Sequence, residues 1–229
     1  METRFVDCRP RAEYLAGHLP AAAHADPEPD LTGDVGGGRH PLPSADAFAA
    51  WASAAGIGPD TLVVGYDDGT GWASRLWWLL RHFGHDAAAV IRLDAWHGPL
   101  TAGEEKITPA TFTPQARADD TADAAELLGR LGDTTLTLVD ARAPERWRGE
   151  TEPIDPVAGR IPGARNRFFL DDSPLPAELL AAPELVVYCG SGVTACAVLH
   201  ELHLAGRHDA RLYPGSFSEW YAIGPVERD

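Results

Sequence analysis

A cysteine at the end of an apolar run is the feature of this sequence with the clearest chemical potential. Residues 186–188 are Val-Val-Tyr, Cys189 follows, and Gly190-Ser191-Gly192-Val193-Thr194 then leads into an apolar helical stretch. This order places the cysteine at the carboxyl end of a strand, where open α/β sheets carry their sites. Glycines let several amide N–H groups point at one centre, and the helix N-terminus adds positive potential there. Both effects favour thiolate over thiol, so the pattern predicts a nucleophilic Cys189, with a buried structural cysteine as the alternative.

The other two cysteines have simpler interpretations. Cys196 lies within the apolar helical stretch, where core packing is expected, and Cys8 follows an aspartate at a strand end and is expected to be structural. Three cysteines do not form a disulfide framework. The first residues do not have the pattern of a signal peptide, and no apolar run approaches the roughly 18 residues of a membrane span. We therefore expect a cytoplasmic protein.

The charge balance bears on the possible partners. The chain has 19 basic and 34 acidic residues, a formal net charge of -15. A surface of that sign repels phosphate backbones and anionic lipid, so we expect neither a nucleic-acid nor a membrane partner. Lys106 is the only lysine, so an anion site must be built from arginine, which suits two-pronged binding of a carboxylate.

The chain also contains an internal repeat. The early segment Phe5-Val6-Asp7-Cys8-Arg9 is matched later by Leu138-Val139-Asp140-Ala141-Arg142. The six-residue step over 67–73, from aspartate to alanine, equals the step over 189–195, from cysteine to alanine. Two copies of one domain are therefore expected.

Short β-branched runs alternate with longer helical patterns in each half, which favours parallel strands with crossover helices. The expected strands are Arg4–Asp7, Thr61–Tyr66, Ala88–Leu93, Leu136–Asp140, Leu185–Tyr188 and Ala210–Tyr213, and the expected helices are Ser44–Ala55, Trp72–Phe83, Thr121–Leu131 and Val193–Ala205. Composition predicts a linker over 98–115 and a surface loop of the first domain over 27–38. The expected fold is α/β, with domains 1–107 (linker from about 97) and 108–229, each a small parallel sheet flanked by helices.

Several motifs accompany the cysteine loop. They are Arg146-Trp147-Arg148-Gly149, Gly159-Arg160-Ile161-Pro162-Gly163-Ala164, Tyr213-Pro214-Gly215-Ser216-Phe217-Ser218-Glu219-Trp220 and, in the first half, Gly38-Arg39-His40-Pro41-Leu42-Pro43. With these motifs, nearly the whole chain resembles tandem-domain sulfurtransferases of the rhodanese superfamily. The loop itself resembles the signature of the 3-mercaptopyruvate branch. The thiosulfate branch carries basic residues after the cysteine, where this chain has Gly190 and Ser191.

The resemblance implies a catalytic second domain and an inactive first one. Asp67 stands where the first copy would need its cysteine, and a carboxylate cannot accept a sulfur atom. The implied activity is transfer of sulfur from 3-mercaptopyruvate, through a Cys189 persulfide, to a thiophilic acceptor, with release of pyruvate. The implied partners are a small-molecule sulfur donor and a thiol or thioredoxin-like acceptor, with cyanide as a further acceptor. No cofactor and no metal are implied.

The resemblance also implies roles for individual residues. The loop amides of Gly190, Gly192, Val193 and Thr194 would cradle the persulfide. Arg146 matches the arginine that binds the substrate carboxylate, and Arg160 is either a second such arginine or a solvent-facing one. Ser191, His18 and Asp7 would form a proton-transfer set, in which Asp7 orients His18.

Other activities remain open at this point. A thiosulfate sulfurtransferase is disfavoured by the missing cationic loop residues, and a sulfur carrier loaded by a partner protein is a further alternative. A phosphatase with a cysteine loop would need an arginine to grip phosphate, and Ala195 cannot do so.

Overall fold

The computed structural model describes residues 2–229 and divides into two compact units. The first unit comprises the chain up to Val35 together with Leu42–Arg117, and the second comprises Gly36–Pro41 and Ala118–Asp229. A six-residue segment of the first half thus packs with the second unit, whereas the sequence suggested a loop of the first domain. An antiparallel bridge between Val35 and Leu42 brackets this segment.

The connecting segment belongs mostly to the first unit. Ala110 N–H donates to the Ser53 carbonyl at 2.9 Å, and Gln115 N–H donates to the Phe83 carbonyl at 2.9 Å. These bonds hold residues 108–117 on the first unit, so the boundary between the compact units follows Arg117 instead of lying near 107.

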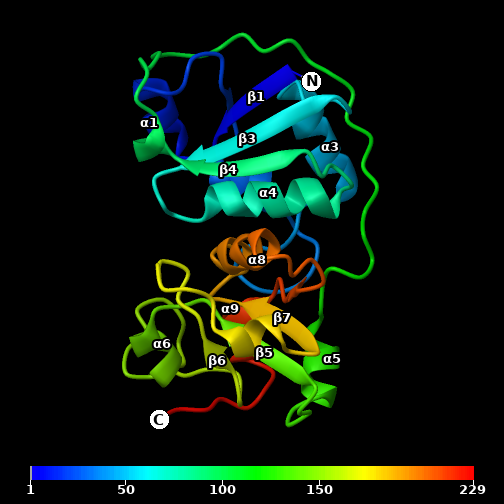
Figure 1. The fold of residues 1–229 in the computed structure, drawn as a ribbon, viewed down its shortest axis with the longest axis vertical. Helices are drawn as coiled ribbons and strands as arrows, with labels where there is room; N and C mark the ends of the chain where they lie inside the picture. Colours follow the sequence, from blue (N-terminus) through cyan, green and yellow to red (C-terminus); the bar gives the residue numbers. More distant parts are fainter. Residues whose placement is uncertain (1) are drawn as a thin grey trace. The chain divides into compact units, whose positions relative to one another are not determined.

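Each unit contains a four-stranded, fully parallel sheet with the same order of strands. The first sheet has the order β2 (Ala23–His24), β1 (Glu2–Asp7), β3 (Thr61–Asp67), β4 (Ala88–Arg92), and the second has β6 (Arg165–Asn166), β5 (Leu136–Asp140), β7 (Glu184–Tyr188), β8 (Arg211–Leu212) (Figure 1). The predicted α/β class and the tandem repeat are therefore confirmed.

Helices connect these strands in both units. The first unit has α1 (Arg11–Ala16), α2 (Pro27–Leu31), α3 (Ala45–Ala54), α4 (Trp72–His82) and the short 3-10 helix Leu93–Ala95. The second has α5 (Ala124–Gly129), α6 (Pro144–Arg148), α7 (Ala177–Leu180), α8 (Ala195–Leu204) and α9 (Ser216–Trp220). Helix α4 packs on β3 and β4, and α8 packs in the corresponding way on β7 and β8.

The predicted elements are found with small changes at their ends. Ser44 caps α3 by accepting a hydrogen bond from Ala47 N–H at 3.2 Å, as its position in the sequence indicates. The helix expected over 121–131 is shortened to α5 because the Asp123 side chain caps it at Glu126 N–H. The stretch expected to be loop from residue 27 begins instead with α2, since Pro27 suits the first turn of a helix.

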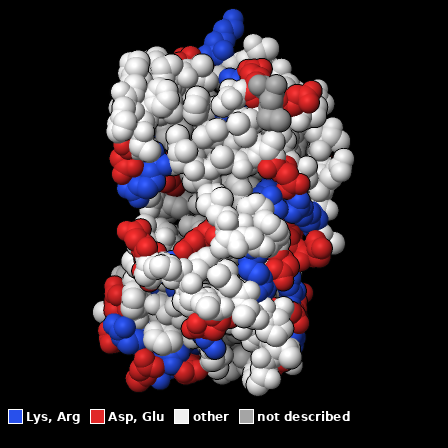
Figure 2. All heavy atoms as spheres, in the orientation of Figure 1, with Lys and Arg blue, Asp and Glu red and all other residues white. Residues whose placement is uncertain are grey.

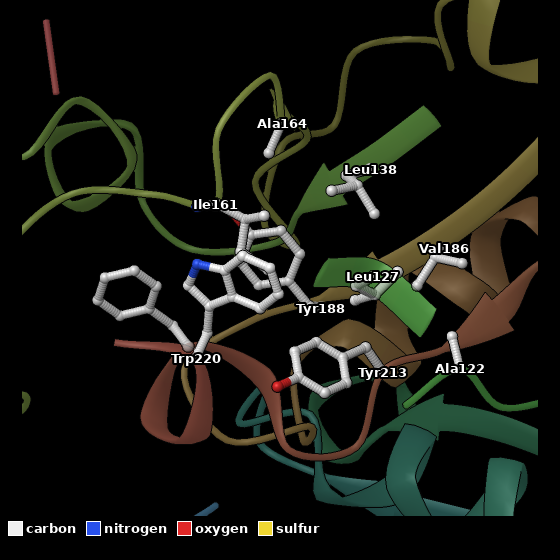
Figure 3. Close-up of a cluster of buried hydrophobic side chains, with 10 residues drawn as sticks. Ala122, Leu127, Leu138, Ile161, Ala164, Val186, Tyr188, Tyr213 and Trp220 are labelled. Atoms are coloured by element: carbon white, nitrogen blue, oxygen red, sulfur yellow. Dashed lines mark hydrogen bonds between the residues drawn. The ribbon is translucent and has the colours of Figure 1, made fainter. Parts of the chain in front are cut away.

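The core of the second unit surrounds the strand that leads to Cys189. Tyr188 is fully buried with Ile161, Tyr213 and Trp220 in one aromatic-rich cluster (Figure 3). The Trp220 indole N–H donates to the Pro225 carbonyl at 2.8 Å, which satisfies its polar atom inside the core. This packing fixes the carboxyl end of β7 and with it the start of the cysteine loop.

A buried aspartate–arginine–tyrosine network ends the first strand of the first unit. Asp7 accepts hydrogen bonds from the Arg9 guanidinium at 2.6 Å and from the Tyr66 hydroxyl at 2.9 Å. Arg9 also donates to the Gly17 carbonyl at 2.6 Å, and Tyr66 accepts from Leu19 N–H at 3.0 Å. The network ties the turn at 17–19 to the sheet.

The second unit repeats this network. Asp140 accepts from Arg142 at 2.7 Å, and Arg142 donates to the Gly159 carbonyl at 2.6 Å. The Tyr188 hydroxyl accepts from Ile161 N–H at 3.1 Å. Burial and the nearby Asp140 raise the pKa of Tyr188 well above its usual value, so the hydroxyl stays neutral. Because both units carry the same arrangement, its role is structural.

The surface carries charges of both signs. On the face shown in Figure 2, Lys and Arg groups lie beside Asp and Glu groups. Among residues 2–229, no helix combines the length and the apolar character needed to cross a bilayer.

Candidate active site

The cysteine loop has the predicted strand–loop–helix geometry. Cys189 directly follows β7, is 2% exposed, and its Sγ accepts a hydrogen bond from Gly192 N–H at 3.1 Å. Gly192 has a φ of +80°, and a Cβ there would lie 2.6 Å from the Pro214 carbonyl oxygen. This turn therefore requires glycine. Val193 and Thr194 precede α8, which begins at Ala195, two residues later than expected.

The segment after β8 braces the loop from one side. Cys189 N–H donates to Ser216 Oγ at 3.2 Å, and the Cys189 carbonyl accepts from Phe217 N–H at 2.9 Å. The Gly190 carbonyl accepts from Ser218 N–H at 2.9 Å. Ser216 has a φ of +53°, a strained backbone state for a non-glycine residue. Strain of about 1 to 3 kcal/mol persists only where surrounding bonds over-determine it, as they do here.

A histidine from residues 36–41 reaches the loop serine. His40 Nδ1 lies 2.8 Å from Ser191 Oγ, so the two side chains share a hydrogen bond. Gly37 and Gly38 make the approach possible: a Cβ on Gly38 would lie 2.4 Å from the Gly215 carbonyl, and one on Gly37 would overlap Glu219. In the sequence, His40 follows a run of glycines and belongs to the motif of residues 38–43, to which no role was assigned.

The contact between Asp7 and His18 that the proton-transfer set requires is not formed. Both Asp7 oxygens are engaged by Arg9 and Tyr66, and the His18 ring bonds through Nδ1 to the Tyr14 carbonyl at 2.8 Å. His18 is fully buried, and its Nε2 lies 3.5 Å from Glu105. In the structure, Asp7 therefore does not orient His18, and the imidazole bonded to Ser191 is that of His40. The reason is the duplicated network, in which Asp7 has the place that Asp140 has in the second unit.

Arg146, the predicted carboxylate-binding residue, lies beside the loop. It extends from α6, and two of its nitrogens donate to Glu152 at 2.6 and 3.1 Å. A Cβ built on Gly190 would lie 3.5 Å from Arg146 Nη2. Burial tends to raise the pKa of Glu152, but hydrogen bonds from Arg146 and from backbone N–H groups outweigh it and lower that pKa. Glu152 therefore stays ionised and holds Arg146 in place.

Arg39 is a second guanidinium beside the loop, and sequence reasoning gave it no role. Its Nη2 would lie 3.2 Å from a Cβ on Gly190, and its Nη1 donates to Asp155 at 2.6 Å. Its backbone N–H donates to Ser218 Oγ at 2.9 Å. Only the tertiary packing of residues 36–41 brings it here.

Arg160 does not supply the second guanidinium at the loop. Its Nη2 pairs with Glu227 and, at 2.7 Å, with Asp229, while its guanidinium lies 4.2 Å from the Trp147 ring centroid. Arg160 is 5% exposed, so it does not face solvent either. The sequence offered these two alternatives, and the structure replaces both with a structural role near the C-terminal residues.

The remaining two cysteines are buried, and neither takes the place of Cys189 in a loop of this kind. Burial, with Asp67 and Asp7 nearby, raises the pKa of the fully buried Cys8 well above its usual value, which favours the thiol. Cys196 is also fully buried, and its Sγ lies 3.3 Å from the Gly192 carbonyl. Both positions fit the packing roles expected for them.

The corresponding loop of the first unit holds a carboxylate. Asp67 accepts hydrogen bonds from the backbone N–H groups of Gly69, Gly71 and Ala73 at 2.8, 2.9 and 2.9 Å. Three amides converging on one anion are a backbone nest. The loop geometry predicted for 189–195 is thus also present here, around an oxygen anion.

Comparison with known proteins agrees with this architecture. The rhodanese-like domain family matches residues 1–95 and again residues 123–223. The probable 3-mercaptopyruvate sulfurtransferase of Pseudomonas aeruginosa is 44% identical over 249 residues, covering 94% of this chain and 88% of that protein. The putative thiosulfate sulfurtransferase SseB of Mycobacterium tuberculosis is 37% identical over 235 residues, covering 91% and 82%.

The fold is also similar to that of a solved relative. The structure of SseA from Escherichia coli, described as a 3-mercaptopyruvate sulfotransferase, gives a TM-score of 0.76 at 26% identity, covering 95% of this chain and 93% of SseA. The family match takes in both sheets, including the loops that end at Ala73 and Ala195. The chain therefore belongs to the rhodanese family, and it is a sulfurtransferase built from two rhodanese-like domains.

Proposed function

We propose that this sulfurtransferase moves a sulfur atom from 3-mercaptopyruvate to a thiophilic acceptor through a persulfide on Cys189, releasing pyruvate. The observation that carries the proposal is the position of Cys189 Sγ. It is held at the end of β7 with the Gly192 amide on it, in the same loop as a serine bonded to an imidazole. The loop has no cationic side chain, as expected for a monoanionic keto acid donor.

In the first half-reaction, the Cys189 thiolate attacks the sulfur of the donor. A sulfur–sulfur bond forms, the carbon–sulfur bond of mercaptopyruvate breaks, and its electron pair passes to the pyruvate enolate. The enolate carbon takes up one proton to give pyruvate, and the persulfide S–H loses one. The net step converts thiolate and mercaptopyruvate into persulfide anion and pyruvate.

Ser191 and His40 are suited to move this proton. A neutral imidazole has one nitrogen that accepts and one that donates, so with a hydroxyl it can relay a proton without net change. The 2.8 Å contact between His40 Nδ1 and Ser191 Oγ supports this role. Positioned acid–base groups contribute about 10²- to 10⁴-fold to such steps.

In the second half-reaction, an acceptor thiolate attacks the outer sulfur of the persulfide. A new sulfur–sulfur bond forms on the acceptor, and the Cys189 thiolate leaves as the old one breaks. A small thiol or a thioredoxin-like protein would serve as acceptor, and cyanide would leave as thiocyanate. The backbone amides of Gly190, Gly192, Val193 and Thr194 are proposed to stabilise the persulfide anion between the two steps.

Thiosulfate is the second candidate donor. The observation that favours it is the pair of guanidinium groups near Gly190, which supply cations that the loop itself lacks. However, Arg39 and Arg146 are each paired with a buried carboxylate, which reduces their attraction for a dianion.

Intact-mass spectrometry of the reduced protein tests the proposal. After brief exposure to 3-mercaptopyruvate, we expect a gain of one sulfur atom that is absent in Cys189→Ser. Loading by thiosulfate but not by mercaptopyruvate would overturn the donor assignment. Loading by neither would refute the small-molecule donor and make a persulfide carrier loaded by a partner protein the leading alternative.

A further inference from the structure

We infer that Arg39 binds the substrate carboxylate together with Arg146, as the second arginine of a two-guanidinium clamp. This assignment rests on the proposed function, because it concerns how a mercaptopyruvate donor is held. The clamp would be built from residues more than a hundred positions apart, both within the second compact unit.

The first argument is the convergence of guanidinium nitrogens on one point next to the nucleophile. A Cβ built on Gly190 would have Arg39 Nη2 at 3.2 Å and Arg146 Nη2 and Nη1 at 3.5 and 3.6 Å. Gly190 directly follows Cys189 in the chain, so this point is one residue from the proposed nucleophile. A larger side chain there would push against both arginines, whereas glycine leaves the nitrogens uncovered.

The second argument is that both arginines are oriented by buried carboxylates. Asp155 accepts from Arg39 Nη1 at 2.6 Å, and its other oxygen lies 3.6 Å from Arg146 Nη2. The Asp155 side chain is only 2% exposed, and that second oxygen has no hydrogen-bond partner among residues 2–229. One buried carboxylate shared by two guanidinium groups fixes their separation, which pre-organises them for a ligand.

The third argument is the way in which the backbone of Arg39 is fixed to the loop. Its N–H donates to Ser218 Oγ, and Ser218 N–H donates to the Gly190 carbonyl, both at 2.9 Å. Ser218 therefore links Arg39 directly to the residue after the nucleophile. The close fit of Gly38 against the Gly215 carbonyl further limits where Arg39 can lie.

The carboxylate of the donor matches the guanidinium N–H groups that are not used in these ion pairs. Arg39 uses Nη1 for Asp155, and Arg146 uses Nε and Nη2 for Glu152. A guanidinium has five N–H donors in a planar fork, so N–H groups of both remain for a third anion. A planar carboxylate near the reacting sulfur can accept from two such forks at once. Inorganic polysulfide, which has no oxygen acceptors, would gain no such two-arginine hold.

Persulfide loading kinetics of Arg39→Ala test this assignment. With 3-mercaptopyruvate, the donor concentration for half-maximal loading should rise about 10- to 100-fold, the effect of losing a charged hydrogen bond. With inorganic polysulfide, which carries sulfane sulfur but no carboxylate, the loading rate should stay within about twofold of wild type. Arg39→Lys should lie between, because a lysine keeps the charge but loses the planar fork.

The matched control is Arg165→Ala. Arg165 is in the same unit, is 55% exposed and pairs with the exposed Glu178 at 3.4 Å. It should load like wild type with both donors. If Arg39→Ala and Arg39→Lys slow both donors equally, or neither, the assignment is wrong. Failure of wild type to load from mercaptopyruvate would instead refute the proposed function, and the clamp with it.

Discussion

The two strand–loop–helix segments of the molecule, 67–73 and 189–195, differ mainly in the residue that ends the strand. In the first, the Asp67 carboxylate fills the loop and accepts three backbone N–H groups. In the second, the Cys189 sulfur accepts one such bond among the described residues, from Gly192. In the first unit, the loop amides bind a carboxylate of the chain itself. In the second unit, the same loop geometry places amides around a cysteine sulfur.

This difference shows that the loop geometry can be kept when the residue that ends the strand changes. A carboxylate cannot form a persulfide, so the first loop has a structural use, in which an internal anion satisfies amides that would otherwise lack partners. The cysteine in the second loop is the proposed nucleophile, and its persulfide would bring the additional anion that the loop can bind. A second difference is two residues further on, where Gly69 stands in one loop and Ser191 in the other.

The largest effect is expected from Cys189→Ser. A serine hydroxyl cannot store a sulfur atom, so sulfur transfer should fall at least about 10³-fold, since the covalent intermediate is lost. Steady-state turnover with 3-mercaptopyruvate and cyanide measures this loss. The thermal unfolding midpoint should change little, because the substitution keeps the size and the loop geometry. Retained turnover would show that the nucleophile lies elsewhere.

The next effect concerns the serine that distinguishes the two loops. Ser191→Gly gives the second loop the residue of the first, and it should slow loading by mercaptopyruvate about 10²-fold by removing the proton relay. His40→Asn should give a similar loss, and the double variant should be no slower than either single one. Rapid-quench loading followed by mass analysis provides the rates.

His18→Asn is the matched control for the relay. Every contact described for His18 lies within the first unit, so it should alter stability but not the loading rate of folded protein. A loading defect in His18→Asn equal to that of His40→Asn would restore the pair expected from the sequence. It would contradict the assignment of His40 as the imidazole that acts on Ser191.

Local patterns in the sequence were sufficient to predict the two sheets and the strand–loop–helix geometry around Cys189. The strands and the Cys189 loop were predictable because their signals, β-branched runs and glycine spacing, lie within about ten residues. The edge strands β2 and β6 have two residues each and contain no β-branched residue, so neither periodicity nor composition marks them as strands. The short helices α6 and α9 have five residues each, too few to show a periodicity, and were missed.

The rest of the site depends on tertiary packing. Arg39 and His40 lie about 150 residues before the cysteine, and only the fit of residues 36–41 against the second unit brings them to it. The contacts of Asp7 could not be predicted, because a carboxylate at a strand end has the same sequence signal whether it is catalytic or structural. The internal repeat indicates these contacts, since Asp140 occupies the same position in the other copy and pairs with Arg142 as Asp7 pairs with Arg9.

A smaller effect, on stability alone, is expected from Asp67→Ala. The variant leaves three backbone N–H groups without their Asp67 partner, two of them buried, so the free energy of unfolding should fall by about 1 to 3 kcal/mol. The rate of sulfur transfer per folded molecule should remain that of wild type. Urea denaturation measures the first quantity and steady-state turnover the second. A loss of turnover without a loss of stability would show that the first loop takes part in catalysis.

The smallest expected effect is on the pH dependence of stability. It concerns two carboxylates that pair with equivalent arginines in the two units. Glu152 is buried and lies 3.1 Å from Arg142, whereas Glu13 is half exposed and lies 3.9 Å from Arg9. Hydrogen bonds from Arg146 outweigh burial and lower the pKa of Glu152 below its usual 4.5. A carboxylate whose pKa is lower in the folded chain stabilises the fold at pH values above its pKa in the unfolded chain. This stabilisation is lost as the pH falls through the pKa of the folded chain.

Between about pH 6 and pH 3, wild type should therefore lose up to about 1 kcal/mol more unfolding free energy than Glu152→Gln, which cannot titrate there. Glu13→Gln should follow the wild-type curve, because an exposed ion pair contributes little. Urea denaturation at several pH values measures all three proteins. Parallel curves for wild type and Glu152→Gln would mean that Glu152 titrates alike in the folded and unfolded chains. Arg146 would then be held by packing instead of by the charge of its partner, and the difference between the two units would lie in the loops alone.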